Sequence, residues 1–156
     1  MKRIMTIAII SILLLVGSFL YLMYRLGAEP KLNVGTLPTG IVSVEGREIM
    51  VEIASDMSSQ VLGLSYRESM AEDRGMIFVY DEPRTQRFWM KGMKFPIDIL
   101  FIQGDRVMQV VSDVPPPNGG LPKVVTSRAK VDKVLEINAG KAEEWGIVEG
   151  AIVKLN

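Results

Sequence analysis

The feature that most constrains this chain is a run of 21 residues without a charge, from Ile4 to Tyr24. At a rise of about 1.5 Å per residue, a helix of this length spans roughly 30 Å, which is the thickness of the hydrocarbon core of a bilayer. Lys2 and Arg3 precede the run and Arg25 follows it, as basic residues commonly do at membrane boundaries. The pattern predicts an N-terminal transmembrane helix within residues 1–27.

A cleaved signal peptide is the competing interpretation of this run. Its apolar region would span about 7–15 residues and would end at a small-x-small site. Cleavage after Ala28 would place Leu26 at the minus-three position, and cleavage after Gly27 would place Arg25 there. Neither residue suits the cleavage pattern, so the sequence favours an uncleaved anchor.

The charges on either side of the run indicate its orientation. The free amine, Lys2 and Arg3 stand before it, against Arg25 and Lys31 after it. The positive-inside rule therefore places the N-terminus in the cytoplasm. We expect a single-pass protein of the cytoplasmic membrane with an extracytoplasmic C-terminal domain.

Two prolines and a glycine in residues 28–39 are typical of a linker, and residues 40–156 then form the domain.

Composition excludes several classes of chemistry. The chain has no cysteine and no histidine, which rules out disulfides, cysteine nucleophiles, histidine-based triads and the common zinc sites. Eighteen basic residues balance eighteen acidic ones, so the chain as a whole has no net field to attract nucleic acid. The densest acidic groups are adjacent pairs typical of solvated turns. We therefore expect no metal site and no cofactor.

Alternating apolar residues separated by turn residues predict a mainly β domain. The first two strands form a hairpin around Glu45–Arg47, and the middle strands follow one another as a meander with turns at Asp81–Pro83 and Gln103–Asp105. Short helices are expected at residues 57–65 and 139–145. Seven or eight short strands with two short helices predict a compact barrel-like or sandwich fold. The expected strands are residues 41–44, 49–53, 75–80, 86–91, 97–102, 106–111, 131–138 and 151–155.

Three ordered blocks of sequence carry a family resemblance. They are GLSYR at 63–67 with RGMIF at 74–78, FWMK at 88–91 with PIDI at 96–99, and VLEINAG at 134–140 with GI at 146–147. Together they resemble the bacterial and archaeal family catalogued as domain of unknown function 192, over roughly residues 44–153. The resemblance implies a small, mainly β fold without an established activity. The chain departs from the family at Gly92-Met93, where Asn-Thr is usual.

Trp89 and Lys91 are the first candidate binding residues. In a strand they share one face, while Phe88 and Met90 share the other. Tryptophan offers a flat apolar surface on which a sugar ring can rest, and Lys91 and Arg67 can donate charged hydrogen bonds beside it. The alternative is purely structural, with Phe88 and Met90 in the core and Trp89 packed at its margin.

Asp98 and Glu136 are the other candidates, because each lies between two aliphatic residues of an apolar strand. Alternation alone could place both on a solvent face. If they are buried, each needs a donor, and we expect Arg67 to pair with one of them. If both face one cleft, they could act as acid and base in a glycosidase-like hydrolase.

The combined expectation is a non-catalytic binding or accessory module of the cell envelope. Its expected contacts are the membrane, through the N-terminal helix, and a small saccharide-like or envelope ligand. The alternatives are a carboxylate-dependent hydrolase using Asp98 and Glu136, and a purely structural envelope protein. No nucleic-acid partner is expected, and no protein partner is identified. The candidate ligand-binding residues are Arg67, Trp89, Lys91, Asp98 and Glu136.

Overall fold

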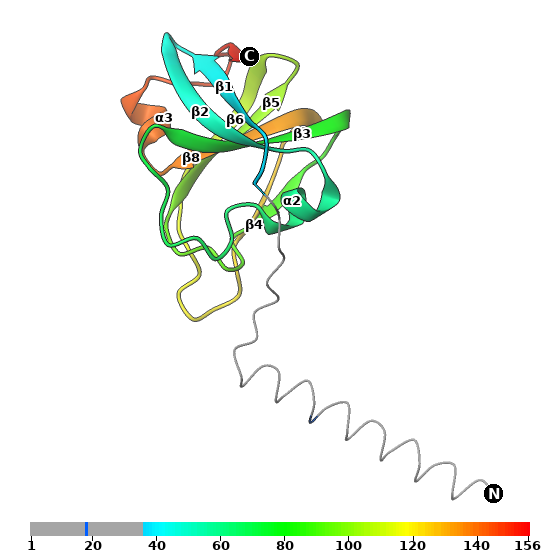
Figure 1. Cartoon of the computed structure of the whole chain (residues 1–156), viewed down its shortest axis with the longest axis vertical. Coiled ribbons are helices and arrows are strands. Elements are labelled where there is room, and N and C mark those ends of the chain that lie inside the picture. The colour runs from blue at the N-terminus through cyan, green and yellow to red at the C-terminus, as the bar shows by residue number, and fades with distance from the viewer. Residues whose placement is uncertain (1–17, 19–35) are drawn as a thin grey trace, which may run out of the picture. The chain divides into compact units, whose positions relative to one another are not determined.

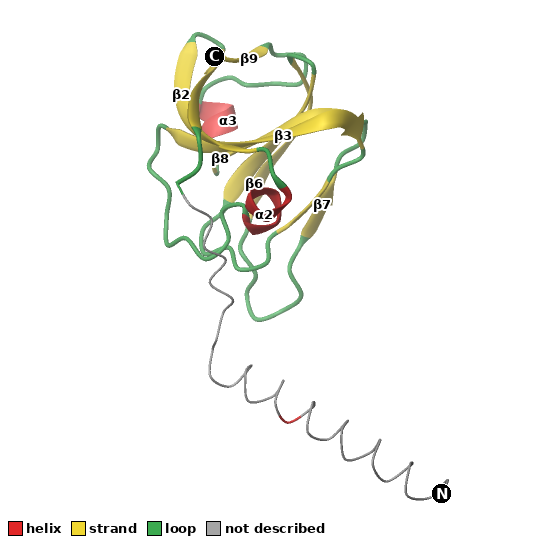
Figure 2. Cartoon of the chain, turned by 45° about the vertical axis from the view of Figure 1, so that its right-hand side comes forward, coloured by secondary structure: helices red, strands yellow, loops and turns green. Residues whose placement is uncertain are grey.

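The computed structural model describes residue 18 and residues 36–156 of the chain. Strands dominate residues 36–156, which form a seven-stranded sheet, a two-stranded ribbon and two short helices (Figure 1) (Figure 2). The expectation of a mainly β fold with two short helices is thereby confirmed for this part of the chain. In chain order the elements are β1 (Thr39–Val44), β2 (Arg47–Ala54), α2 (Met57–Leu62), β3 (Arg74–Arg84), β4 (Arg87–Trp89), β5 (Ile97–Gln103), β6 (Arg106–Val114), β7 (Val124–Thr126), β8 (Val131–Asn138), α3 (Lys141–Glu144) and β9 (Val153–Leu155).

The strands of the large sheet follow the order β6-β5-β8-β3-β2-β1-β9. All neighbours are antiparallel except β2 and β3, which run parallel. The predicted hairpin of β1 and β2 is confirmed, but the predicted meander is wrong. β8 lies between β3 and β5 and separates strands that we expected to follow one another. Apolar alternation sets which face of a strand is buried, and it does not say which distant strand will lie beside it.

The two edges of the large sheet meet, which gives the domain a barrel-like form. Arg106 in β6 forms an antiparallel bridge with Ile152, just before β9. The Val107 amide donates a hydrogen bond to the Ala151 carbonyl at 3.0 Å, and the Val107 carbonyl accepts one from the Gly150 amide at 2.8 Å. These contacts satisfy backbone groups that an open edge strand would leave unpaired.

Two clusters of buried side chains occupy the two faces of the sheet. The inner cluster fills the barrel and includes Val42, Val51, Ile77, Leu100, Val107, Leu135 and Val153, one from each strand of the large sheet. The outer cluster lies on β3, β5 and β8 beneath the segment after α2 and the β4–β7 ribbon, and it includes Phe78, Ile99, Phe101, Val134, Leu64, Met90 and Val125. Both faces of β5 and β8 are therefore covered, which explains why these strands are continuous apolar runs in the sequence.

The segments around the outer cluster differ most from the prediction. Residues 124–126 form β7, a strand too short to give a clear alternating pattern. β3 continues through Asp81–Pro83, where a turn was predicted, and its register against β8 shifts between Val79 and Arg84. Such an irregularity accommodates a proline, which cannot donate a hydrogen bond to the ladder. The two helices end at Leu62 and Glu144, earlier than predicted.

No helix in the described part of the chain is long and apolar enough to cross a membrane. The predicted anchor, Ile4 to Tyr24, lies outside the described residues except for Ser18. Residues 36–38 have no regular structure, and β1 begins at Thr39, one residue before the predicted start of the domain.

Asp98 connects the sheet to α3. Its side chain is fully buried. Its Oδ1 accepts a hydrogen bond from the Asp113 amide at 2.8 Å, and its Oδ2 accepts one from the Ala142 amide at 2.9 Å. Asp113 lies in β6 near a register shift that separates the pairings of Ile97 and Ile99. The carboxylate therefore holds an irregular end of β6 and the first turn of α3 on the barrel.

We expect Asp98→Asn to lower the free energy of unfolding by about 2–4 kcal/mol, because the new amide nitrogen cannot accept a hydrogen bond and leaves one buried backbone amide without a partner. Urea unfolding followed by circular dichroism measures the change. Asp105→Asn is the control, since Asp105 is exposed in the β5–β6 turn, and it should change stability by less than about 0.5 kcal/mol. Equal stability of Asp98→Asn and the original chain would contradict the anchoring role.

Candidate functional site

Two carboxyl groups and a methionine form a row across the outer face of the sheet. Glu52 of β2 is in register with Met76 of β3, and Met76 is in register with Glu136 of β8. Residues directly opposite each other on neighbouring strands point to the same face. With about 4.8 Å between strands, the Cα atoms of Glu52 and Glu136 are roughly 10 Å apart. The pairing thus brings two acids to one face of the sheet.

The loop after α2 places Arg67 over this row. Asp56 caps the start of α2 by accepting hydrogen bonds from two backbone amides. Gly63 ends the helix with a φ of 51°, a left-handed value that glycine adopts without steric cost. Beyond it, Nη1 and Nη2 of Arg67 donate to Oε1 and Oε2 of Glu52 at 2.5 and 2.7 Å. The guanidinium and the carboxylate therefore form a bidentate ion pair.

This ion pair corrects the prediction that Arg67 binds Asp98 or Glu136. Asp98 already accepts two backbone hydrogen bonds, and Glu136 lies two strands away from the carboxylate that Arg67 contacts. Sequence reasoning missed Glu52, although Glu52 also lies between aliphatic residues of an apolar strand. The signal was present in the sequence, but only the parallel pairing of β2 and β3 brings Glu52 to this row.

The two acids of the row have opposite electrostatic environments. Hydrogen bonds from Arg67 lower the pKa of the Glu52 carboxyl, and the same bonds raise the pKa of the Arg67 guanidinium. Burial raises the pKa of Glu136 to about 8, while the positive charge of Arg67 acts in the opposite direction. Glu136 is 6% exposed, and no described residue donates a hydrogen bond to its carboxyl group. At pH 7 Glu136 is therefore mostly protonated, and Glu52 is ionised.

Two hollows open beside the ion pair, and both are lined by Glu52 and Arg67. The first has a volume of about 260 Å³ and is also lined by Thr36, Leu37, Ser59, Leu62 and Gly63. The second has a volume of about 330 Å³ and is also lined by Thr39, Met50, Val51, Ser69, Met70, Ala71, Arg74 and Gly75. The second hollow combines two guanidinium groups, a carboxylate and two hydroxyl groups. These donors and acceptors suit a small hydroxylated ligand.

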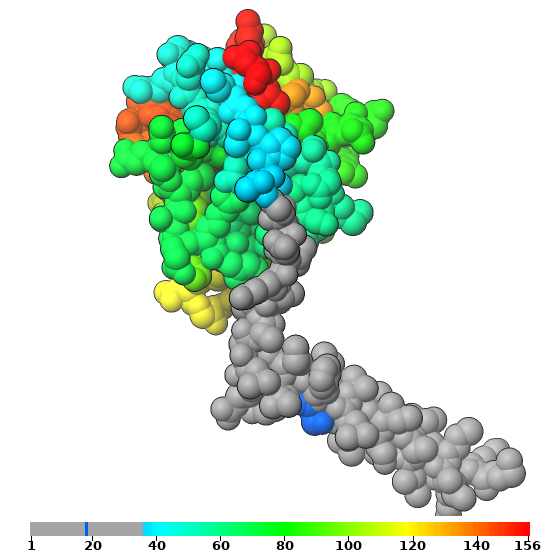
Figure 3. All heavy atoms as spheres, viewed as in Figure 1, coloured from blue at the N-terminus to red at the C-terminus, as the bar shows by residue number. Residues whose placement is uncertain are grey.

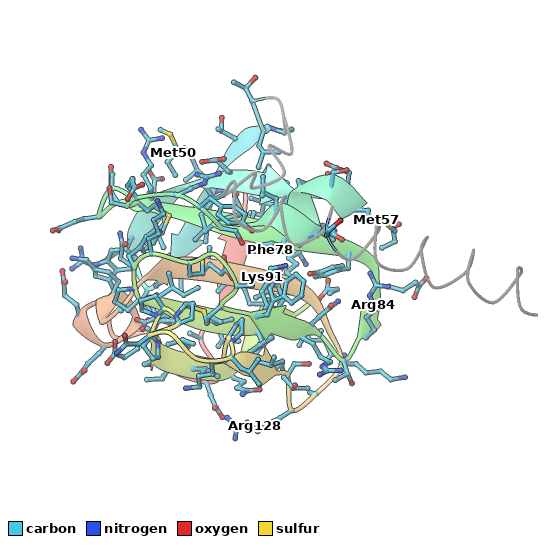
Figure 4. All side chains as sticks on the ribbon, turned by 90° about the horizontal axis from the view of Figure 1, so that it is seen from below. Met50, Met57, Phe78, Arg84, Lys91 and Arg128 are labelled. Carbon is cyan, nitrogen blue, oxygen red and sulfur yellow. The ribbon has the colours of Figure 1, made fainter. Side chains whose placement is uncertain are left out.

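Trp89 and Lys91 form a separate feature on the β4–β7 ribbon. Trp89 is half exposed, and the Lys91 Nζ lies 5.4 Å from the centroid of its ring. The strand predicted over residues 86–91 covers only Arg87–Trp89, so Lys91 reaches the ring from the turn that follows β4. On the opposite face Phe88 packs edge-on against Phe78 with 4.8 Å between ring centroids, and Met90 is buried. Figure 4 shows Lys91 near the middle of the domain seen from below. Neither Trp89 nor Lys91 lines either hollow.

The departure from the family pattern at Gly92 has a backbone explanation. Gly92 has a φ of 73°, in the left-handed region that glycine and asparagine adopt most readily. Its carbonyl accepts a hydrogen bond from the Tyr66 amide at 2.7 Å, and a Cβ added to Gly92 would lie 2.9 Å from the Tyr66 ring. Glycine thus allows this segment to pack closely against the loop that carries Arg67.

Asp98 and Glu136 lie on opposite faces of the sheet. Glu136 is in register with Ile99, whereas Asp98 is in register with Ile137. Ile99 belongs to the outer cluster and Ile137 to the inner one. The two carboxyl groups therefore do not share the cleft that the hydrolase alternative requires. Within residues 36–156, no three acidic side chains are grouped so that they could hold a metal ion.

Comparisons with known proteins agree with this fold. The family model described as DUF192, uncharacterized ACR, matches residues 40–155. A crystal structure from Sinorhizobium meliloti 1021, described as a "putative transcription regulator", is similar with a TM-score of 0.71 and 31% identity, covering 78% of this chain and 96% of that chain. A protein of unknown function from Novosphingobium aromaticivorans DSM 12444 has a TM-score of 0.70 and 31% identity, covering 78% of this chain and 89% of that chain. No curated protein matches the chain.

We expect the raised pKa of Glu136 to make the domain less stable as pH increases. Between its ordinary value of 4.5 and the folded value of about 8, the folded state keeps a proton that the unfolded state has lost. Stability from this group is therefore fully present below pH 4.5 and falls as pH rises through 8. Glu136→Gln should remove this dependence. Between pH 5 and pH 8 the original chain should therefore lose roughly 3 kcal/mol more of its free energy of unfolding than the variant does.

Chemical unfolding at the two pH values measures the difference. Glu48→Gln serves as the control, because Glu48 is an exposed acid on the same sheet. If Glu136→Gln and the original chain lost the same stability between pH 5 and pH 8, Glu136 would not be a buried, protonated acid.

Proposed function

Because the chain belongs to the DUF192 family of uncharacterised proteins, no activity comes with its membership, and we propose from its own site that the domain is a non-catalytic binding module. Its ligand is a small, hydroxylated, saccharide-like molecule that carries an acidic group. The ligand occupies the second hollow, beside the ion pair of Arg67 and Glu52. Trp89 and Lys91 belong to a different surface and are not part of this binding site.

The observation that carries the proposal is the position of the ion pair between two hollows. About a third of each side chain is exposed, 33% for Arg67 and 34% for Glu52, so a ligand can reach polar atoms whose geometry is already held. Sugar hydroxyl groups can donate to the Glu52 carboxylate and accept from the guanidinium. A bidentate pair loses little side-chain freedom when a ligand adds to it, which favours binding of a small molecule.

Charge in the second hollow favours an acidic ligand. Arg67 is paired with Glu52, which also feels the charge of Arg74. The ion pair of Arg74 is with Asp73, whose Oδ1 lies 3.9 Å from Nε of Arg74 on an exposed pair. An exposed pair at this distance compensates charge weakly. Because burial raises the pKa of Glu136 to about 8, this group adds little negative charge at neutral pH. Arg74 therefore supplies a guanidinium that can bind a carboxylate on the ligand.

The arrangement of the acidic side chains within the described residues also agrees with a binding role. Glu136 lines neither hollow, and Glu52 is engaged by Arg67 through both of its oxygens. The two acids on this face are therefore not arranged to act together on a ligand bound beside Arg67. This supports a module that holds its ligand without changing it.

The domain can be tested without the N-terminal segment, because the family model matches residues 40–155 and the similarity to the crystal structure from Sinorhizobium meliloti covers 96% of that chain. Residues 36–156 are titrated calorimetrically with glucuronic acid, N-acetylmuramic acid and the neutral sugar N-acetylglucosamine. We expect the acidic sugars to bind more tightly than the neutral one. Arg67→Lys should weaken binding at least tenfold, about 1.4 kcal/mol, because lysine cannot make two parallel hydrogen bonds to Glu52.

The matched control is Arg128→Lys, which alters an exposed arginine that is also paired with a glutamate, Glu149, but lines neither hollow. Arg67→Lys should change the free energy of unfolding by no more than about 1 kcal/mol, since the pair is partly solvated. Absence of binding to every sugar acid would favour the purely structural alternative. Equal affinity of Arg67→Lys and the original domain would place the ligand elsewhere.

We also propose that the domain lies outside the cytoplasmic membrane, held by the segment from Ile4 to Tyr24. The support is the excess of positive charge before this segment over that which follows it. Protease added to intact spheroplasts should then digest the domain while a cytoplasmic marker protein stays intact. Protection of the domain until the cells are lysed would reverse the orientation.

A further inference from the structure

The β4–β7 ribbon presents one face to solvent and the other to the outer cluster. Phe88 and Val125 are paired in register, and both lie at the outer cluster, Val125 buried and Phe88 partly so. Trp89 and Val124 form the next pair along the ribbon. Because side chains alternate along a strand, this second pair points away from the cluster. The ribbon therefore has an outward face that the rest of the domain does not cover.

Large apolar side chains gather on this outward face. Trp89 is 50% exposed and its partner Val124 is 48% exposed. Leu121 is 96% exposed and lies three residues before Val124, on a loop that protrudes at the bottom of the domain (Figure 3). The chain covers at most about 10 Å over three residues, so Leu121 stays close to the Trp89–Val124 pair. A group of large apolar side chains exposed close together is a candidate interaction surface.

The chain segments that contain the ribbon are rich in positive charge. Residues 83–97 and 114–131, which contain both strands of the ribbon, hold seven Lys and Arg and no Asp or Glu. Ion pairs occupy two of the seven, Lys94 with Glu68 and Arg128 with Glu149. The others, among them Arg87, have no acidic partner in the described part of the chain. Figure 4 places Lys91 centrally on the side seen from below, with Arg84 and Arg128 toward the margins.

We propose that this outward face docks onto a membrane surface that contains anionic lipids. We call it the ribbon face and define it by Arg87, Trp89, Lys91, Leu121 and Val124. A tryptophan with a lysine 5.4 Å from its ring suits the boundary between lipid headgroups and acyl chains, where an aromatic ring and a cation both find partners. Leu121 and Val124 can enter the acyl layer, while the cations contact anionic headgroups.

A lipid surface fits the ribbon face better than a nucleic acid does. A nucleic acid would use the cations and could stack on Trp89, but it would leave the aliphatic side chains of Leu121 and Val124 without a favourable partner.

The length of chain before the domain also favours a membrane, because an anchor ending at Tyr24 would leave only 14 residues before Thr39. Fourteen residues span at most about 50 Å, which is the greatest distance at which such an anchor could hold the domain from the membrane. The docking proposal is independent of the ligand site at Arg67.

The test uses residues 36–156, so that binding does not depend on the anchor. Vesicles of phosphatidylcholine with about one-third phosphatidylglycerol are compared with pure phosphatidylcholine vesicles in a sedimentation assay. We expect binding to the anionic vesicles only, and weaker binding as salt is raised. Lys91→Gln and Arg87→Gln should each weaken binding about fivefold. Leu121→Ser, on an exposed loop where it cannot disturb the core, should also weaken binding severalfold.

Fluorescence gives a second measurement. The chain has two tryptophans, Trp89 and Trp145, so Trp145→Phe leaves Trp89 as the single reporter. Its emission should shift to shorter wavelength when anionic vesicles are added. The matched control is Val148→Ser, because Val148 is 64% exposed in the segment after α3; this variant should bind vesicles like the original domain. Arg67→Lys should do so as well, which separates this proposal from the ligand site.

Several results would overturn the proposal. Failure to sediment with anionic vesicles, or equal sedimentation with neutral ones, would remove lipid charge as the attraction. Unchanged binding in Lys91→Gln, Arg87→Gln and Leu121→Ser would move the contact to another surface. Tighter binding of the domain to a 20-base-pair DNA duplex than to anionic vesicles at the same salt would make the ribbon face a nucleic-acid surface instead.

Discussion

The parallel pairing of β2 with β3 is the constraint on which the rest of the domain depends. Parallel neighbours cannot be joined by a tight turn and need a crossover segment. Residues 55–73 supply it, with α2 near the start and Arg67 in the following loop. Leu64 of this crossover packs into the outer cluster. The segment that makes the parallel connection therefore also covers the sheet and delivers a guanidinium to Glu52.

Coverage of the outer face explains the state of Glu136. On a strand with one solvated face this acid would be ionised and exposed. In β8 the outer face is buried, and desolvation raises the pKa of Glu136 to about 8. A neutral acid needs no counterion, so Arg67 pairs with Glu52 at the rim, where about a third of each side chain is exposed. A ligand would therefore meet the charged Arg67 and Glu52 at the exposed end of the row, because the Glu136 end is buried.

The candidate ligand site and the ribbon face are chemically different, yet two hydrogen bonds connect the loops that carry them. The Ser65 hydroxyl donates to the Lys91 carbonyl at 2.8 Å, and the Tyr66 amide donates to the Gly92 carbonyl at 2.7 Å. The close approach at Gly92 makes the second contact sterically feasible. Arg67 and Trp89 therefore belong to one packed layer on the outer face, with the polar hollows and the apolar, basic ribbon as separate surfaces.

Local chemistry in the sequence determined most strands of the large sheet, the hairpin of β1 and β2 and the helix that Asp56 caps. Each of these depends on neighbours within a few residues, because alternation and capping are short-range effects. Only the tertiary structure decided that Arg67 meets Glu52, and that Asp98 and Glu136 lie on opposite faces. Those outcomes depend on the register and order of strands far apart in the chain, which the packing of both faces of the sheet selects.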